Sequence, residues 1–124
     1  MITGEVNAEL EATIPIVVCG ANGEERQVSA VIDTGFTGFL TLPAALVTSL
    51  DLEWVNLEEG LLGDGSVHSF DVYGAVVIWN GETREVEVNV TETAPLIGMA
   101  MLFRHDLQIE VVVGGTVRIE AALP

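Results

Sequence analysis

An aspartate placed between two apolar runs is the feature of this sequence best suited to chemistry. The tripeptide Asp33-Thr34-Gly35 follows the run Ala-Val-Ile at 30–32 and precedes the run Phe-Leu-Thr-Leu at 39–42. Apolar runs of this kind are typical of buried strands, and an unpaired carboxylate beside a core costs free energy. The position of Asp33 therefore indicates chemistry at its carboxylate. The alternative is a side chain that only forms a turn between two strands.

The composition predicts one folded domain, residues 1–124, with a strongly acidic surface. Apolar residues make up 49% of the chain. It contains 19 Asp and Glu residues but only four basic residues, all Arg, which gives a net charge of −15. This charge repels phosphate backbones and anionic lipid, so we expect neither nucleic acid nor a membrane as a partner. The amino terminus does not resemble a signal peptide, and no apolar run reaches the roughly 20 residues of a membrane helix. We therefore expect a cytoplasmic protein.

Strands separated by glycine-rich turns account for nearly all of the expected structure. Val, Ile and Thr recur along the chain and Gly interrupts them at short intervals, which favours an all-β fold. The Asn-Gly pairs at 22–23 and 80–81 predict hairpins of type I′, in which both central residues have positive φ. One helix is expected at 43–50, with Pro43 in its first position, and a helical turn at 99–103. Strands are expected at 11–18, 27–32, 39–42, 52–57, 67–78, 85–90, 108–113 and 117–121, with further turns at 63–65, 105–106 and 114–115.

The two halves of the chain repeat one order of elements. The first half has a strand, the turn at 22–23, a second strand and then Asp33-Thr34-Gly35. The second half has a strand, the turn at 80–81, a second strand and then Leu96-Ile97-Gly98, with the helical turn after it. If the halves are pseudo-repeats, Gly98 corresponds to Gly35, and Asp33 has no acidic counterpart in the second half.

The same residues resemble the retropepsin-type aspartic proteases, in particular the small bacterial and archaeal ones. That family has an apolar-apolar-Asp-Thr-Gly motif, a Gly-bearing hairpin called the flap, and an apolar-apolar-Gly motif before a short helix. Here these elements are residues 31–35, Gly63-Asp64-Gly65 and Leu96-Ile97-Gly98, in the same order over about residues 14–112. Phe36 and Asp64 depart from the family, which favours a small residue after the motif and Gly or an apolar residue at the flap tip.

The resemblance implies a closed all-β barrel of the acid-protease fold, with one or two short helices and two pseudo-repeats. It also implies an endopeptidase that works as a homodimer without metal or cofactor. Asp33 of each copy would meet at the two-fold axis, Thr34 would hydrogen-bond across the pair, and the Gly35 amide would hold an Asp33 oxygen. The tripeptide Gly63-Asp64-Gly65 would cover an extended peptide substrate, and Leu96-Ile97-Gly98 would line its site.

Two further functions stay open from the sequence. One is a catalytically idle dimerisation or peptide-binding module with the same fold, and the other is a plain β-barrel binding module in which Asp33-Thr34-Gly35 is a coincidence. An ordinary hairpin is nearly as good an explanation of residues 63–65 as a functional flap. His68 with Asp64 and Asp71 fits no standard metal-site spacing. Trp54 and Trp79 are expected in the core or in an interface.

Overall fold

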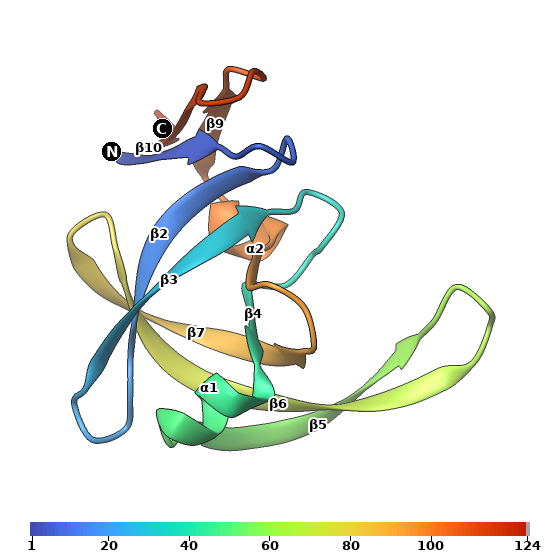
Figure 1. Cartoon of the computed structure of the whole chain (residues 1–124). Helices are drawn as coiled ribbons and strands as arrows, with labels where there is room; N and C mark the ends of the chain where they lie inside the picture. The colour runs from blue at the N-terminus through green and yellow to red at the C-terminus, as the bar shows by residue number, and fades with distance from the viewer. Residues whose placement is uncertain (124) are drawn as a thin grey trace.

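A computed structural model describes residues 1–123, and it confirms an all-β architecture (Figure 1). Six strands in the order β6-β7-β4-β8-β3-β2 close into a ring, because β6 pairs with β7 on one side and with β2 on the other. β5 extends the sheet beyond β6, and β1, β10 and β9 extend it beyond β2. The elements are β1 (Ile2–Val6), β2 (Ala12–Cys19), β3 (Glu25–Ile32), β4 (Leu40–Pro43), α1 (Ala44–Ser49), β5 (Glu53–Leu61), β6 (Val67–Trp79), β7 (Glu82–Thr91), β8 (Leu96–Ile97), α2 (Met99–Leu102), β9 (His105–Ile109) and β10 (Thr116–Ala121).

The core fills the inside of this ring. In β2, Ile14, Ile16 and Val18 are buried at every second position, as expected for a strand with one face on a core. Leu40 on β4 and Ile97 on β8, two neighbouring strands of the ring, are fully buried as well. Each such side chain contributes about 2 kcal/mol to folding. Among the described residues, no helix is long and apolar enough to cross a membrane.

The two Asn-Gly hairpins differ in their turns. Asn80 and Gly81 have φ of 54° and 83°, so the prediction of type I′ geometry is confirmed between β6 and β7. At the other hairpin only Gly23 has positive φ, at 85°, and its amide donates to the carbonyl of Gly20. This turn between β2 and β3 is longer, because the Gly20 amide donates to the carbonyl of Glu24. The type I′ prediction is therefore wrong there.

Several predicted boundaries also differ. Pro43 ends β4 with an extended backbone (φ −64°, ψ 148°) and stands at the N-cap of α1, so it is not the first residue of the helix. The residues at 105–106, predicted as a turn, begin β9 instead. The strand predicted at 108–113 ends at Ile109, and the valines at 111–113 form an exposed loop. The glycines at 114–115 cause this, because they exchange hydrogen bonds with Val6 and tie the loop to β1.

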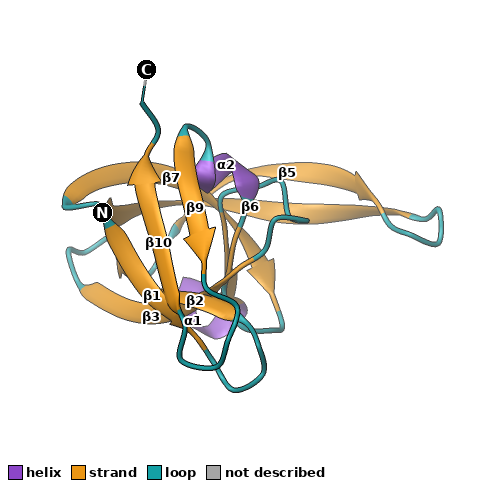
Figure 2. Ribbon diagram, turned by 90° about the horizontal axis from the view of Figure 1, so that it is seen from above, coloured by secondary structure: helices purple, strands orange, loops and turns teal. Residues whose placement is uncertain are grey.

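The sequence predicts no strand at residues 2–6, where the structure has β1. This strand pairs with β10 and with β2, which brings the start and the end of the chain together on one side of the molecule (Figure 2). Trp79 is buried in the core as predicted, whereas Trp54 is 54% exposed on β5. The Trp54 indole donates to Asp71 on the neighbouring strand.

Candidate active site

The parallel pairing of β3 with β8 positions Asp33. These two strands run parallel, with Val31 opposite Leu96 and Ile32 opposite Ile97. Asp33 follows directly, and its amide donates to the carbonyl of Ile97 at 2.9 Å. Because both strands are part of the barrel wall, the carboxylate leaves the chain at a point that the core holds in place.

The side chain of Asp33 is held from its own loop. The Gly35 amide donates to Oδ1 of Asp33 at 2.9 Å, as the sequence predicts, and the Phe36 amide donates to the Asp33 carbonyl at 3.1 Å. A Cβ on Gly35 would lie 3.2 Å from that same Oδ1, so glycine suits this close approach. Asp33 is partly buried and Thr34 is exposed. The contact has the form of an Asx turn, and it leaves Oδ2 without a partner among the described hydrogen bonds.

The start of α2 closes on the loop that follows Asp33. The Gly98 amide donates to the carbonyl of Phe39, the Met99 amide to that of Phe36, and the Ala100 amide to that of Gly38, at 2.8–3.1 Å. A Cβ on Gly98 would collide with the carbonyl oxygens of Gly38 and Phe36. The second motif therefore packs against the loop that follows the first. In the strand register Gly98 follows Ile97 as Asp33 follows Ile32.

Phe36 shows why a large residue fits after the motif. A Cβ added to Gly38 would lie 2.5 Å from its ring, and one added to Gly98 would lie 2.6 Å from it. The ring thus covers two glycines that have no side chains of their own. It packs the Asp33 loop onto the start of α2.

Sequence reasoning missed Thr41. This side chain is buried on β4, and its hydroxyl oxygen accepts a hydrogen bond from the Leu96 amide at 2.8 Å. The bond connects β4 to the first residue of β8. A threonine between two leucines is ordinary in a strand, so the sequence carries no signal of this role.

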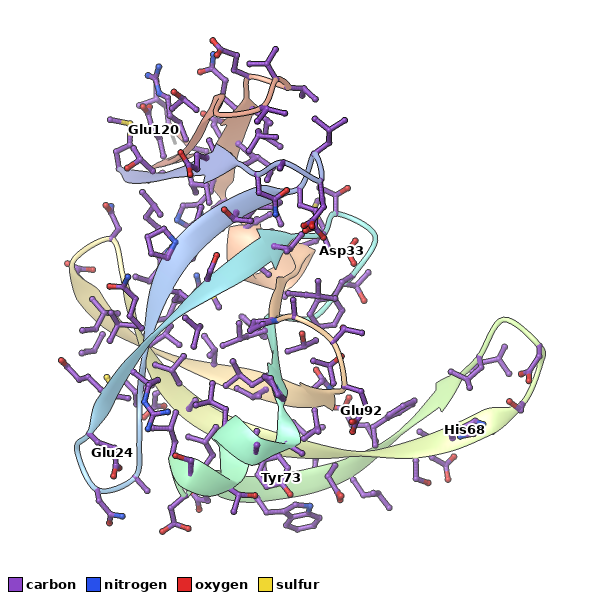
Figure 3. The ribbon with its side chains drawn as sticks, viewed as in Figure 1. Glu24, Asp33, His68, Tyr73, Glu92 and Glu120 are labelled. Atoms are coloured by element: carbon purple, nitrogen blue, oxygen red, sulfur yellow. The ribbon has the colours of Figure 1, made fainter. Side chains whose placement is uncertain are left out.

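The residues Gly63, Asp64 and Gly65 lie at the tip of the long β5–β6 hairpin, as predicted. The hairpin projects from the barrel on the side of the molecule that also carries Asp33 and Glu92 (Figure 3). The Leu62 amide donates to the Ser66 carbonyl, and Gly65 has φ of 86°. Asp64 accepts hydrogen bonds from the hydroxyl and the amide of Ser66, which hold the pKa of its carboxyl below the ordinary value.

The structure thus brings together two of the three predicted groups. One direct hydrogen bond, from the Asp33 amide to the Ile97 carbonyl, joins residues 33–35 to residues 96–98, whereas the tip at 63–65 is bonded only within its own hairpin. A groove of about 670 Å³ lies elsewhere, against Gly74, Val55 and Glu87, and none of the predicted site residues lines it. In the described part of the chain, no group of three or more His, Cys, Asp or Glu side chains could hold a metal ion.

Solved structures show what this arrangement is similar to. A retropepsin-like aspartic protease from Rickettsia conorii superposes with a TM-score of 0.61 at 17% identity, over 98% of this chain and 91% of that one. The chain has a retropepsin-like fold. EIAV protease, in complex with the inhibitor HBY-793, superposes with a TM-score of 0.56 at 17% identity, over 78% of this chain and 89% of that one. No protein-family model matches the chain, and no curated protein matches it either.

Proposed function

We propose that this chain is an aspartic endopeptidase that works as a homodimer, with Asp33 of both copies forming one site. The observation that carries the proposal is the position of Asp33 at the end of β3, hydrogen-bonded to β8, in a retropepsin-like fold. In the second half of the chain, Gly98 follows the end of β8, and no second carboxylate stands at that position. Hydrolysis by a carboxylate pair therefore requires Asp33 of another copy, and a two-fold axis supplies it symmetrically.

The paired carboxylates would divide the acid and base work between them. Two carboxylates a few ångströms apart share one proton, because both cannot be ionised cheaply. The ionised member takes a proton from a water molecule, which then attacks the peptide carbonyl carbon. The protonated member donates its proton to the carbonyl oxygen. We expect the rate to fall at both acidic and alkaline pH, because this mechanism needs one protonated and one ionised carboxylate.

The other predicted residues have supporting roles in this proposal. The Gly35 amide orients one oxygen of Asp33, and the exposed Thr34 hydroxyl is available to the partner copy. The backbone at Leu96, Ile97 and Gly98 would line the site beside Asp33, because the Ile97 side chain itself is buried in the core. The hairpin tip at 63–65 covers an extended peptide, which would bind through strand-like hydrogen bonds.

The change Asp33→Asn tests the carboxylate. It keeps the size of the side chain and the hydrogen bond from Gly35 but removes the charge, so cleavage of an unfolded protein substrate should fall roughly 1,000-fold or more. The matched control is Asp106→Asn, the same change at an exposed position of β9. The control should cleave at the wild-type rate, and sedimentation should find both variants dimeric.

Mixing the two forms tests the shared site. At constant total concentration, wild-type chain refolded with an equal amount of the Asp33→Asn variant should keep about a quarter of the activity, because only wild-type pairs carry both carboxylates. Activity that falls in simple proportion to the wild-type fraction would mean one chain is sufficient, and the proposal would be wrong. A wild-type dimer that cleaves nothing across the pH range would favour the idle dimerisation or peptide-binding module.

A further inference from the structure

Arg84 on β7 reaches the far end of α2. Its Nη1 donates to the Met101 carbonyl at 3.0 Å, and its Nη2 donates to the Ala100 carbonyl at 3.5 Å. The last carbonyls of a helix have no partner within the helix, and a cationic side chain is well suited to bind them. The start of α2 is bound to the Asp33 loop through Met99 and Ala100. Arg84 therefore binds the C-terminal end of α2, and the N-terminal end of α2 binds the Asp33 loop.

The guanidinium of Arg84 also contacts two aromatic rings. Its Cζ lies 5.6 Å from the centre of the Phe39 ring and 5.8 Å from that of Trp79. Phe39 belongs to the same loop as Asp33, and its carbonyl accepts the Gly98 amide. Trp79 is fixed in turn, because its indole donates to Nε2 of His105 at 3.1 Å. One side chain thus joins the Asp33 loop, α2 and the barrel wall.

The charge environment makes this placement unusual. The chain carries 19 acidic residues, but the ion pair formed among the described residues is Arg118 with Glu120, and Arg84 has no carboxylate partner there. A partly buried guanidinium in so acidic a chain is instead bound to two carbonyls and two rings. A planar guanidinium can donate along two directions and stack on rings at once, which an ammonium group cannot do.

We infer that Arg84 is a positioning residue for the proposed hydrolysis. It fixes α2 and Phe39 relative to each other, and so sets where the Asp33 loop presents its carboxylate to the partner copy. This inference rests on the proposed function for its effect on catalysis. Its effect on the loop itself does not require the chain to be an enzyme, so the two ideas can fail separately.

The test compares Arg84→Met and Arg84→Lys with Arg118→Met, a matched change at an exposed position of β10. Well below the unfolding temperature, Arg84→Met should lower kcat roughly tenfold to 100-fold through misplacement of the carboxylate, with KM within about twofold. Arg84→Lys should give an intermediate kcat, since it keeps the positive charge but loses the planar guanidinium that binds two carbonyls at once. In an Arg84→Ala variant, added methylguanidinium should restore part of the lost kcat. The control should match the wild type.

Amide hydrogen exchange gives the second readout, which needs no activity. In Arg84→Met the amides of Met99 and Ala100 should exchange faster, whereas amides of β2 and β10 should not change. If Arg84→Met does not fold, kcat and amide exchange are measured on Arg84→Lys instead. The inference is overturned if a folded Arg84→Met has wild-type kcat and wild-type exchange at those amides, or if kcat falls without any change in exchange. A wild-type chain that cleaves nothing would overturn the proposed function alone.

Discussion

The Asp33 loop and the β5–β6 hairpin are held in opposite ways. The loop is bound by β8 through Ile97 and by α2 through Gly98, and the Phe36 ring covers its glycines. Beyond its base, the hairpin forms hydrogen bonds only between its own two strands and within its tip. Almost every residue of β5 is exposed. Fixed donors and a packed backbone suit a group that must stay in one geometry. A free ribbon suits an arm that must move over a bound peptide.

The apolar side chains of the hairpin strengthen this contrast. Leu57, Leu61 and Val67 are 57%, 74% and 63% exposed, and the register places Leu61 opposite Val67 on one face. A two-stranded ribbon is only marginally stable by itself in water, and exposed apolar side chains in a group mark a binding surface. In the proposed enzyme, substrate and the partner copy would cover the ribbon, and the loop needs no such cover to keep its shape.

The largest expected effect comes from adding a methyl group at Gly98, which packs against the Asp33 loop. Gly98→Ala puts a Cβ against the carbonyl oxygens of Gly38 and Phe36, so backbone must shift and the free energy of unfolding should fall by about 3 kcal/mol. The melting temperature should fall by roughly 10 °C, with loss of activity. Thermal unfolding at one fixed chain concentration measures this.

Gly63→Ala is the matched control, because a Cβ there meets no atom within 4 Å. Its melting temperature should equal that of the wild type. Equal melting temperatures for Gly98→Ala and Gly63→Ala would show that the loop is no better held than the hairpin, and the comparison would be lost.

A smaller effect is expected at the bond between β4 and β8. Thr41→Val keeps the shape of the side chain but removes the oxygen that the Leu96 amide needs, which leaves a buried donor unpaired. The free energy of unfolding should fall by about 2 kcal/mol, as denaturant titration would measure. Thr41→Ser keeps the hydroxyl and should recover most of the loss. If the serine variant is as unstable as the valine variant, the hydrogen bond is not what holds β8.

The sequence predicts the loop better than the elements that hold it. Asp33 between two apolar runs, and glycine at 35 to admit its carboxylate, are local patterns, so both could be predicted. The strand β1 could not, because its partner β10 lies at the other end of the chain. The valines at 111–113 have strand propensity, but the glycines that follow them are bound to Val6, and such tertiary contacts override propensity.

Arg84 shows the same limit within the site. It stands in a segment of alternating Glu and Val on β7, where it looks like one more solvent-facing residue. Its contacts with Met101 and Phe39 depend on how β7 packs against two segments distant in sequence. Local pattern identifies the group that could do chemistry, and only the packed barrel identifies what positions it.

The smallest expected effect lies at the hairpin tip. Ser66→Ala removes the hydroxyl that donates to Asp64, so the pKa of that carboxyl should rise toward its ordinary value. Because the folded-state pKa lies below that of the unfolded chain, the bond favours the folded tip at higher pH and is lost as the pH falls through the lowered pKa. An NMR titration of the Asp64 carboxyl measures the shift, with Ser69→Ala on β6 as the control that leaves it unchanged. The tip is open to solvent and bonded only to itself, so the melting temperature at neutral pH should move by less than about 1 °C. If Ser66→Ala lowered the melting temperature as much as Thr41→Val does, the hairpin tip would support the barrel, and the hairpin would not be a freely moving arm.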